Sequence, residues 1–227
     1  MSAETAYLAL ILDAPLQSWG FASRFQRRTS GLSPTKSGVI GLICAAMGIG
    51  KGTDAERVKL PHLAALKMTT IAIARDYSRL EDFHTVQGTR RASGKPNLDP
   101  VVTRRQYLEG ALFGVILAGD SELLERVAAA LQDPTWGIWF GRKSCIPARP
   151  VLVTLVDVFA NAWRAILQKL EMDEEIPMER FSRVEDVADF TAGTDSFNDQ
   201  PISFGHADSS SEGRAFTVSR VHFEPGA

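Results

Sequence analysis

At the centre of the sequence stands LFGVILAGDSELLERVAAAL (residues 112–131), which begins as an apolar run and ends as an amphipathic helix. The run from Leu112 to Ala118 predicts a fully buried strand. Asp120 or Ser121 supplies a helix cap, and Pro134 closes the helix. Its apolar face consists of side chains at helical spacing: Leu123, Leu124, Val127 and Leu131.

Working outward, the flanking sequence completes a β-α-β-β-α-β order. Tyr7 to Leu12 is an aliphatic strand, and a helix follows between Thr35 or Ser37 and Gly48. Met68 to Arg75 alternates as a strand does, and Val151 to Val158 is the last strand of the set. This order is the split βαβ arrangement, so we expect an α+β fold of the ferredoxin-like or RNA-recognition-motif (RRM-like) type.

The domain organisation expected is one RRM-like domain over residues 1–158 and an acidic C-terminal extension, residues 159–227, packed on it. A shorter helix, from Asp54 to Lys67, is predicted to be interrupted at Pro61. In the extension, residues 171–211 are polar and weakly patterned, and alternation returns only from Phe216 to Phe223.

A long insertion separates the second and third strands. Residues 77–107 stand where a hairpin loop usually has about 2–5 residues. The insertion is basic, and Val101, Val102 and Thr103, followed by Tyr107, predict that its return arm is a strand. We expect a projecting β-arm or thumb.

The charge of the chain is small in total but uneven along it. Residues 1–150 carry 19 Lys and Arg against 13 Asp and Glu, whereas residues 151–227 carry 6 against 14. Because screening limits electrostatic reach to about 10 Å, the amino-terminal part can bind a polyanion although the net charge is −2. An ordinary surface of mixed charge is the alternative interpretation.

Other classes find little support. Cys44 and Cys145 lack CxxC spacing, the four histidines lack metal-ligand spacing, and no apolar run reaches the length of a membrane span. We therefore expect a cytoplasmic protein without a metal, a cofactor or a membrane partner.

Basic side chains suited to phosphate gather in two segments. Guanidinium and ammonium groups bind phosphate oxygens, and an aromatic ring beside them can stack on a base. Trp19 either stacks in this way or supports its loop from the core, and the backbone N–H groups of Ser37 and Gly38 begin a helix where a phosphate can dock. The predicted RNA-binding residues are Trp19, Arg24, Arg27, Arg28, Lys36, Ser37, Gly38, Arg142 and Lys143.

The insertion offers a second set of contacts. His84 is the only histidine among basic residues, and it is open to three interpretations: a general base for RNA cleavage, a contact to RNA or to a neighbouring subunit, or a structural residue. The expected contacts to RNA or to a subunit are His84, Gln87, Arg90, Arg91, Arg104 and Arg105.

Four segments, in this order, resemble the CasD family, the CRISPR RNA (crRNA) 5′-handle-binding subunit of the type I-E CRISPR complex Cascade. They are APLQSWG (14–20) with PTKSGVIGL (34–42), DFHTVQG (82–88), TRRQYL (103–108) and FGRKSCIP (140–147). The resemblance covers about residues 5–155, and the acidic tail has no matching motif.

The resemblance implies a non-catalytic, RRM-like subunit with a thumb that caps the 5′ handle of crRNA in antiviral defence. The implied partners are crRNA, the backbone subunit CasC, the large subunit CasA and, through the shared RNA, the processing subunit CasE, with target DNA in the assembled ribonucleoprotein. No catalytic residue is expected. The alternatives are a metal-independent endoribonuclease that processes repeat RNA through His84, and a protein-interaction module without RNA contact.

Overall fold

The computed structural model describes residues 4–20, 26–74, 76–91, 93–97, 99–187, 195–205 and 216–224. The fold is mixed α+β, with a seven-stranded antiparallel sheet and a smaller sheet of four strands. Within the described residues, no helix has the length and apolar character needed to cross a membrane.

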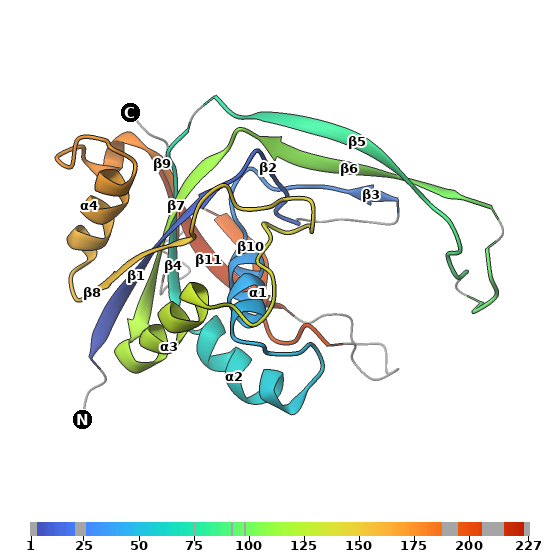
Figure 1. Cartoon of the computed structure of the whole chain (residues 1–227), viewed down its shortest axis with the longest axis horizontal. Helices are drawn as coiled ribbons and strands as arrows, with labels where there is room; N and C mark the ends of the chain where they lie inside the picture. The colour runs from blue at the N-terminus through green and yellow to red at the C-terminus, as the bar shows by residue number, and fades with distance from the viewer. Residues whose placement is uncertain are drawn as a thin grey trace.

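The larger sheet forms the body of the molecule (Figure 1). Its strands lie in the order β10-β11-β9-β4-β7-β1-β8. The central pair, β1 and β7, is in register from Thr5↔Asp120 to Asp13↔Leu112. The strand bounds are β1 Thr5–Asp13, β4 Lys67–Ala72, β7 Leu112–Asp120, β8 Leu152–Val156, β9 Ser182–Asp186, β10 Asp195–Pro201 and β11 Phe216–Glu224.

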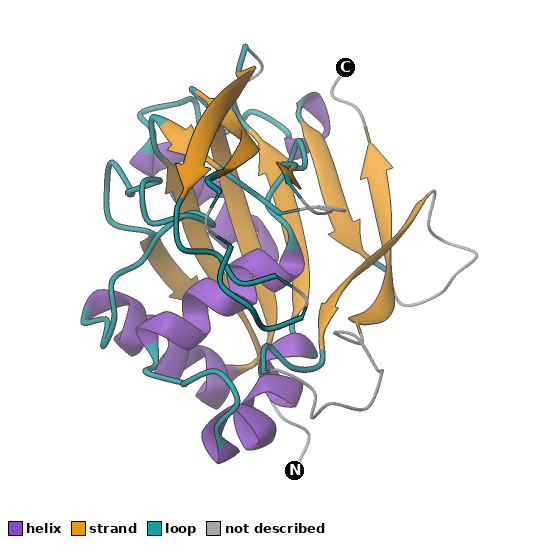
Figure 2. Ribbon diagram, turned by 90° about the vertical axis from the view of Figure 1, so that its right-hand side faces the viewer, coloured by secondary structure: helices purple, strands orange, loops and turns teal. Residues whose placement is uncertain are grey.

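Both faces of this sheet are covered, because the apolar side chains of β1 alternate between two cores. Leu8, Leu10 and Leu12 point into the larger core with Trp19 and the apolar faces of α1 and α3. Ala9 and Ile11 point to the opposite side, where α4 packs on them. Figure 2 shows the strands side by side with helices packed across them.

Side-chain caps fix the starts of three helices. Thr35 caps α1 (Lys36–Ala46), Thr53 caps α2 (Asp54–Ala64) and Asp120 caps α3 (Ser121–Gln132), whereas α4 (Phe159–Lys169) has no side-chain cap. The predicted interruption of α2 is wrong, because Pro61 lies inside a continuous helix. Its place near the carboxyl end, followed by the turn bond from Ala65 N–H to Pro61 O, lets the helix continue.

The insertion forms a long antiparallel hairpin, named the arm here. Strands β5 (Ser78–Val86) and β6 (Val101–Glu109) pair from Ser78↔Glu109 to Val86↔Val101. Figure 1 shows the arm projecting from the body, with β2 (Leu16–Gln17) and β3 (Arg27–Arg28) beside β6.

The C-terminal extension adds strands to the same sheet. A 3₁₀ turn, η1 (Met178–Arg180), precedes β9, and β9 pairs with β4. The interpretation of residues 171–211 as weakly patterned therefore missed both β9 and β10. One carboxylate helps to attach this region to α2. Glu56 accepts the N–H group of Phe204 in the extension and that of Gly52 just before the helix.

Candidate RNA-binding surface

Four arginines lie side by side at the root of the arm. Strand β3 runs parallel to β6, with Arg27 opposite Arg104 and Arg28 opposite Arg105. The pairing is extended by a hydrogen bond from Arg104 N–H to Gln26 O (2.9 Å). Arg27, Arg28 and Arg104 are exposed, and Arg105 is half-buried. Two segments separated by about 75 residues thus place their positive charges together.

A third segment joins them through Arg142. The Nη2 atom of Arg142 donates to Arg28 O (3.0 Å), and its guanidinium lies over the ring of Tyr107, 4.4 Å from the ring centre. Such a cation–π contact holds the guanidinium in one orientation. Lys143, the next residue, is exposed with its Nζ 5.6 Å from the centre of the Trp139 ring. Together these residues form the basic surface: Arg27, Arg28, Arg104, Arg105, Arg142 and Lys143.

The acidic groups near this surface neutralise little of its charge. Glu81 is 3.6 Å from Arg104 Nη1, and both side chains are about half exposed. Exposed pairs of this kind contribute only about 0–1 kcal/mol and are easily exchanged for another anion. Asp82 lies opposite Arg105 across β5 and β6. The basic surface therefore keeps an excess of positive charge.

Trp19 takes the supporting role and not the stacking role. Only 1% of its surface is exposed, its ring stacks on Phe140, and its Nε1 donates to Gln17 Oε1 (3.0 Å). A ring enclosed in this way has no free face for a base, so its prediction as an RNA-binding residue is corrected. It belongs to the core because Gly38 of α1 leaves room for it: a Cβ there would lie 2.9 Å from Trp19 Cε3.

Lys36 and the start of α1 are also engaged within the chain. Lys36 Nζ is 2.5 Å from Asp186 Oδ2, and the two side chains are 6% and 9% exposed. The Asp199 carboxylate accepts the N–H groups of Lys36 (2.5 Å) and Ser37 (3.1 Å) and the hydroxyl of Ser37 (2.6 Å).

The remaining donor at this helix end, Gly38 N–H, binds Thr35 Oγ1 (3.3 Å). Lys36, Ser37 and Gly38 were predicted to hold phosphate, and in this structure carboxylates and a hydroxyl take that place. Burial raises the pKa of Asp199 despite these donors.

The arm carries the other predicted contacts. His84 and Gln87 are exposed, and the His84 carbonyl accepts the hydroxyl of Thr103 (3.0 Å). Arg90 and Arg91 are exposed near the tip, where Arg91 Nη2 lies 3.3 Å from Asn97 Oδ1 and 3.9 Å from Asp99. Gln87, Arg90 and Arg91 lie beyond the basic surface toward the tip, whereas Arg104 and Arg105 belong to it. His84 borders it, because it pairs with Thr103, the residue next to Arg104. Arg24 falls outside the described residues.

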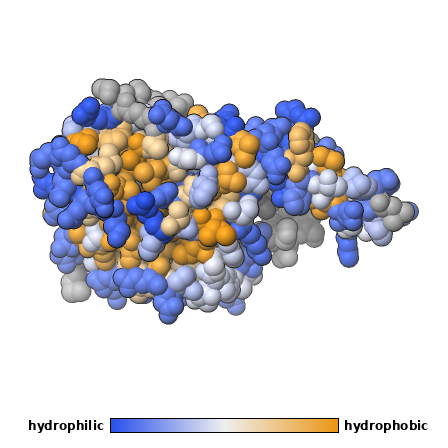
Figure 3. Space-filling view, turned by 45° about the horizontal axis from the view of Figure 1, so that its top comes forward, coloured by the Kyte–Doolittle hydropathy of each residue, from blue (hydrophilic) through white to orange (hydrophobic). Residues whose placement is uncertain are grey.

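Sequence reasoning missed an exposed aromatic ring on the arm. Phe83 is 61% exposed and lies opposite Arg104, whose guanidinium is 5.4 Å from the ring centre. Val102, 48% exposed, lies further along the arm, and Figure 3 shows such hydrophobic side chains on an otherwise mainly hydrophilic projection. The alternation of side chains along β5 could have indicated this exposed ring. Phe83 points to the opposite face of the strand from Leu80, Asp82 and His84.

The chain belongs to the CRISPR-associated Cas5 family, whose model matches residues 7–221. It is 29% identical over 157 residues to the CRISPR system Cascade subunit CasD of Escherichia coli (strain K12), a match that covers 65% of this chain and 70% of that protein. The resemblance to the CasD family is thereby confirmed.

Two solved structures are similar over almost the whole chain. One is described as a CRISPR RNA-guided surveillance complex, with a TM-score of 0.70, 26% identity, and coverage of 97% of this chain and 90% of that one. The other is described as a crystal structure of a Cas protein, with a TM-score of 0.64, 27% identity, and coverage of 97% and 98%. Both structural similarities continue into the C-terminal extension, whose sequence has no motif resembling the CasD family.

Proposed function

We propose that this protein is a non-catalytic subunit of a CRISPR RNA-guided surveillance complex and that its basic surface binds the 5′ handle of crRNA. The observation that carries the proposal is the meeting of three distant segments in one set of cations. Arg27, Arg28, Arg104 and Lys143 are exposed, and Arg105 and Arg142 are half-buried among them. The names of the similar proteins support the setting, since they include a Cascade subunit and an RNA-guided complex.

The fold is consistent with this role. We infer a ferredoxin-like, RRM-like core from strands β1, β4, β7 and β8 with α1 and α3, because they follow one another as β-α-β-β-α-β and lie in the order β4-β7-β1-β8. Fold alone does not define function, so the weight rests on the basic surface.

The arm is proposed to contact the neighbouring backbone subunit. Its strand β5 is exposed along nearly its whole length, with Phe83 and Leu80 open to solvent. Exposed apolar side chains on a projecting element are typical of a surface that a partner covers. His84, Gln87, Arg90 and Arg91 would then contact that subunit or the RNA that it carries. The large subunit, and CasE through the RNA, are further expected neighbours.

The test measures binding of a labelled crRNA that carries its 5′ handle, as a function of salt. We expect the affinity to fall with salt at a log–log slope of about −0.7 per phosphate neutralised. Arg27→Glu/Arg28→Glu should weaken binding and make the slope shallower by about 1.4 if each arginine contacts one phosphate. The matched control is Arg164→Glu/Lys169→Glu, which makes the same change of charge on exposed positions of α4.

The same assay, run with EDTA, tests the two alternatives. A discrete cleavage product that is lost in His84→Ala would establish an endoribonuclease. Binding that is indifferent to salt, or reduced equally by both charge-reversal variants, would reject the basic surface as the RNA site. No binding by any form of the protein would favour the protein-interaction module.

A further inference from the structure

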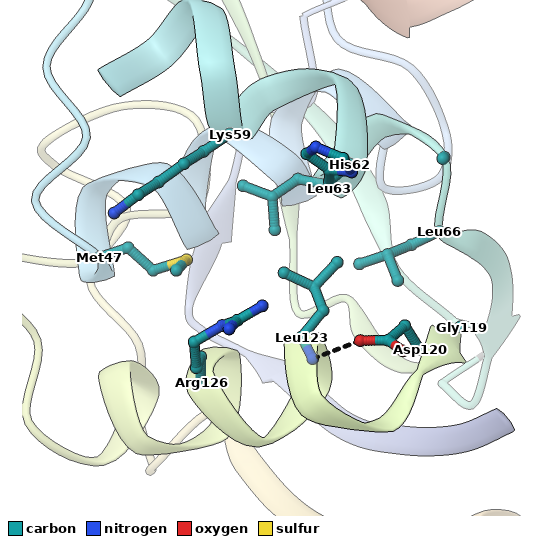
Figure 4. Close-up of a pocket in the computed structure, with 10 residues that line it drawn as sticks. Met47, Lys59, His62, Leu63, Leu66, Gly119, Asp120, Leu123 and Arg126 are labelled. Carbon is teal, nitrogen blue, oxygen red and sulfur yellow. Dashed lines mark hydrogen bonds between the residues drawn. The ribbon is translucent and has the colours of Figure 1, made fainter. Parts of the chain in front are cut away.

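A groove lies between α2 and α3 (Figure 4), at the lower edge of the body in Figure 1, whereas the arm leaves the upper edge. Its volume is about 550 Å³. The floor is apolar, with Leu63, Leu66 and Leu123 between the two helices (Figure 4). Leu66 lies across Gly119, where a Cβ would be 2.4 Å from its Cδ2 atom, so the groove depends on that glycine.

The groove leaves part of the core open. Met47 and Leu123 pack against the main hydrophobic core but remain half-buried. A second molecule seated here would bury them further, and the removal of apolar surface from water favours association.

Basic side chains line both walls of the groove. Lys59 and His62 project from α2, and neither has an ion pair with any residue that the structure describes. Arg126 projects from α3 and is only 4.0 Å from Glu122, an exposed pair that contributes little. Asp120 is the single acidic residue of the lining, and its carboxylate is engaged with Leu123 N–H (2.8 Å) as the helix cap.

We propose that this groove is the docking site for an acidic, amphipathic helix of a partner protein, and the proposal rests on the proposed role as a subunit of a larger complex. Apolar side chains of such a helix would fill the space between α2 and α3, and its carboxylates would meet Lys59 and Arg126. A helix in a hydrophobic groove is a recurring mode of recognition, and complementary charge fixes its orientation. An aliphatic floor without an aromatic ring is poorly suited to RNA, whose bases bind by stacking.

The position of the groove allows it to act independently of the basic surface. The arm leaves the upper edge of the body in Figure 1, whereas α2 and α3 lie at its lower edge. RNA and this partner can therefore be held at the same time, and the two functions can be separated by mutation.

Thiol labelling tests whether the groove is covered in the assembled complex. Lys59→Cys and Arg126→Cys introduce reporters on the two walls, and Gln168→Cys on α4 is an exposed control. The native thiols of Cys44 and Cys145 are buried and give little background. Labelling rates with a maleimide are compared for the free protein, the protein with crRNA, and the protein with crRNA and the other protein subunits of the complex.

We expect both reporters to react at least about tenfold more slowly only when the other protein subunits are present, because interface cores exclude solvent. Unchanged rates in the assembled complex overturn the proposal. Protection by crRNA alone assigns the groove to RNA, and protection in the free protein, with a dimer in sedimentation, assigns it to a second copy of this chain. Either result also overturns it.

A charge variant separates this proposal from the proposed function. Lys59→Glu/Arg126→Glu should be incorporated into the complex at least about tenfold less efficiently, the change expected when like charges face each other across an interface. Its crRNA affinity should stay that of the unmodified protein. If crRNA does not bind even the unmodified protein, the proposed function fails, while the labelling result still reports on the groove.

Discussion

Two aspartates of the C-terminal extension decide what the start of α1 can bind. In sequence, Lys36, Ser37 and Gly38 are a cation followed by free N–H groups, which is the pattern of a phosphate site. The local pattern shows the donors and not their acceptors. Asp186 and Asp199, about 150 residues away, provide the acceptors. A carboxylate satisfies a helix end for the same electrostatic reason as a phosphate.

This arrangement predicts that Lys36 stabilises the fold and does not bind RNA. In Lys36→Met, the nearly buried Asp186 keeps only the N–H of Met68 (3.1 Å), so the free energy of unfolding should fall by about 3 kcal/mol. Lys36→Met/Asp186→Leu should recover part of the loss, because no buried charge remains unpaired. Chemical denaturation measures both variants. A stable Lys36→Met protein with weakened crRNA binding would contradict this assignment.

Cys44 predicts a specific loss of stability at alkaline pH. Burial, with the charge of Glu56 as a smaller cause, raises the pKa of its thiol from 9.0 to about 12. A group with a raised pKa stabilises the folded state below its unfolded value, and this contribution is lost as the pH rises through the folded value. The unfolding free energy of the unmodified protein minus that of Cys44→Ala should therefore decrease by about 2 kcal/mol between pH 8 and 10.5. A difference that is constant with pH would refute a buried, neutral thiol.

At the scale of the elements, the sequence was most informative where the pattern is local. The buried run of β7 and the cap of α3 by Asp120 follow from neighbouring residues alone. The return strand of the arm was likewise expected from its own residues. Strand β10 was missed because its sequence, DSFNDQP, is polar, and its place depends on pairing with β11. The contribution of pairing with a distant strand cannot be predicted from the composition of the strand itself.

The turn after Phe140 shows why glycine is required in this motif. Gly141 has φ +90°, and a Cβ on it would lie 1.7 Å from Ser18 O. Gly141→Ala should lower the free energy of unfolding by about 2 kcal/mol or more, since both the backbone and the Ser18 contact must shift. Gly20→Ala is the matched control, because a Cβ there meets nothing within 4 Å. Equal thermal stability of the two variants would contradict this.

At the scale of the whole molecule, the candidate site exists only through contacts between distant segments. Sequence reasoning identified all five arginines, but it divided them between two sets of contacts. The parallel pairing of β3 with β6 and the bond from Arg142 to Arg28 unite them. Short strands such as Arg27–Arg28 have no pattern of their own, so this union could not be read from the sequence.

The distal arm and the body should be separable by deletion. Replacing residues 84–103 by Asn-Gly would join Phe83 to Arg104, which already lie opposite each other, through a two-residue hairpin turn. The unfolding free energy should change by less than about 1 kcal/mol, because most side chains removed are exposed. Binding of crRNA by the shortened protein alone should remain within about threefold, as the basic surface is intact, whereas incorporation into the complex should fall strongly.

The three quantities are measured by denaturation, by binding of labelled RNA and by co-assembly with the backbone subunit. Normal co-assembly would show that the distal arm is not the subunit contact, and loss of RNA affinity without the partner would move part of the RNA site onto it.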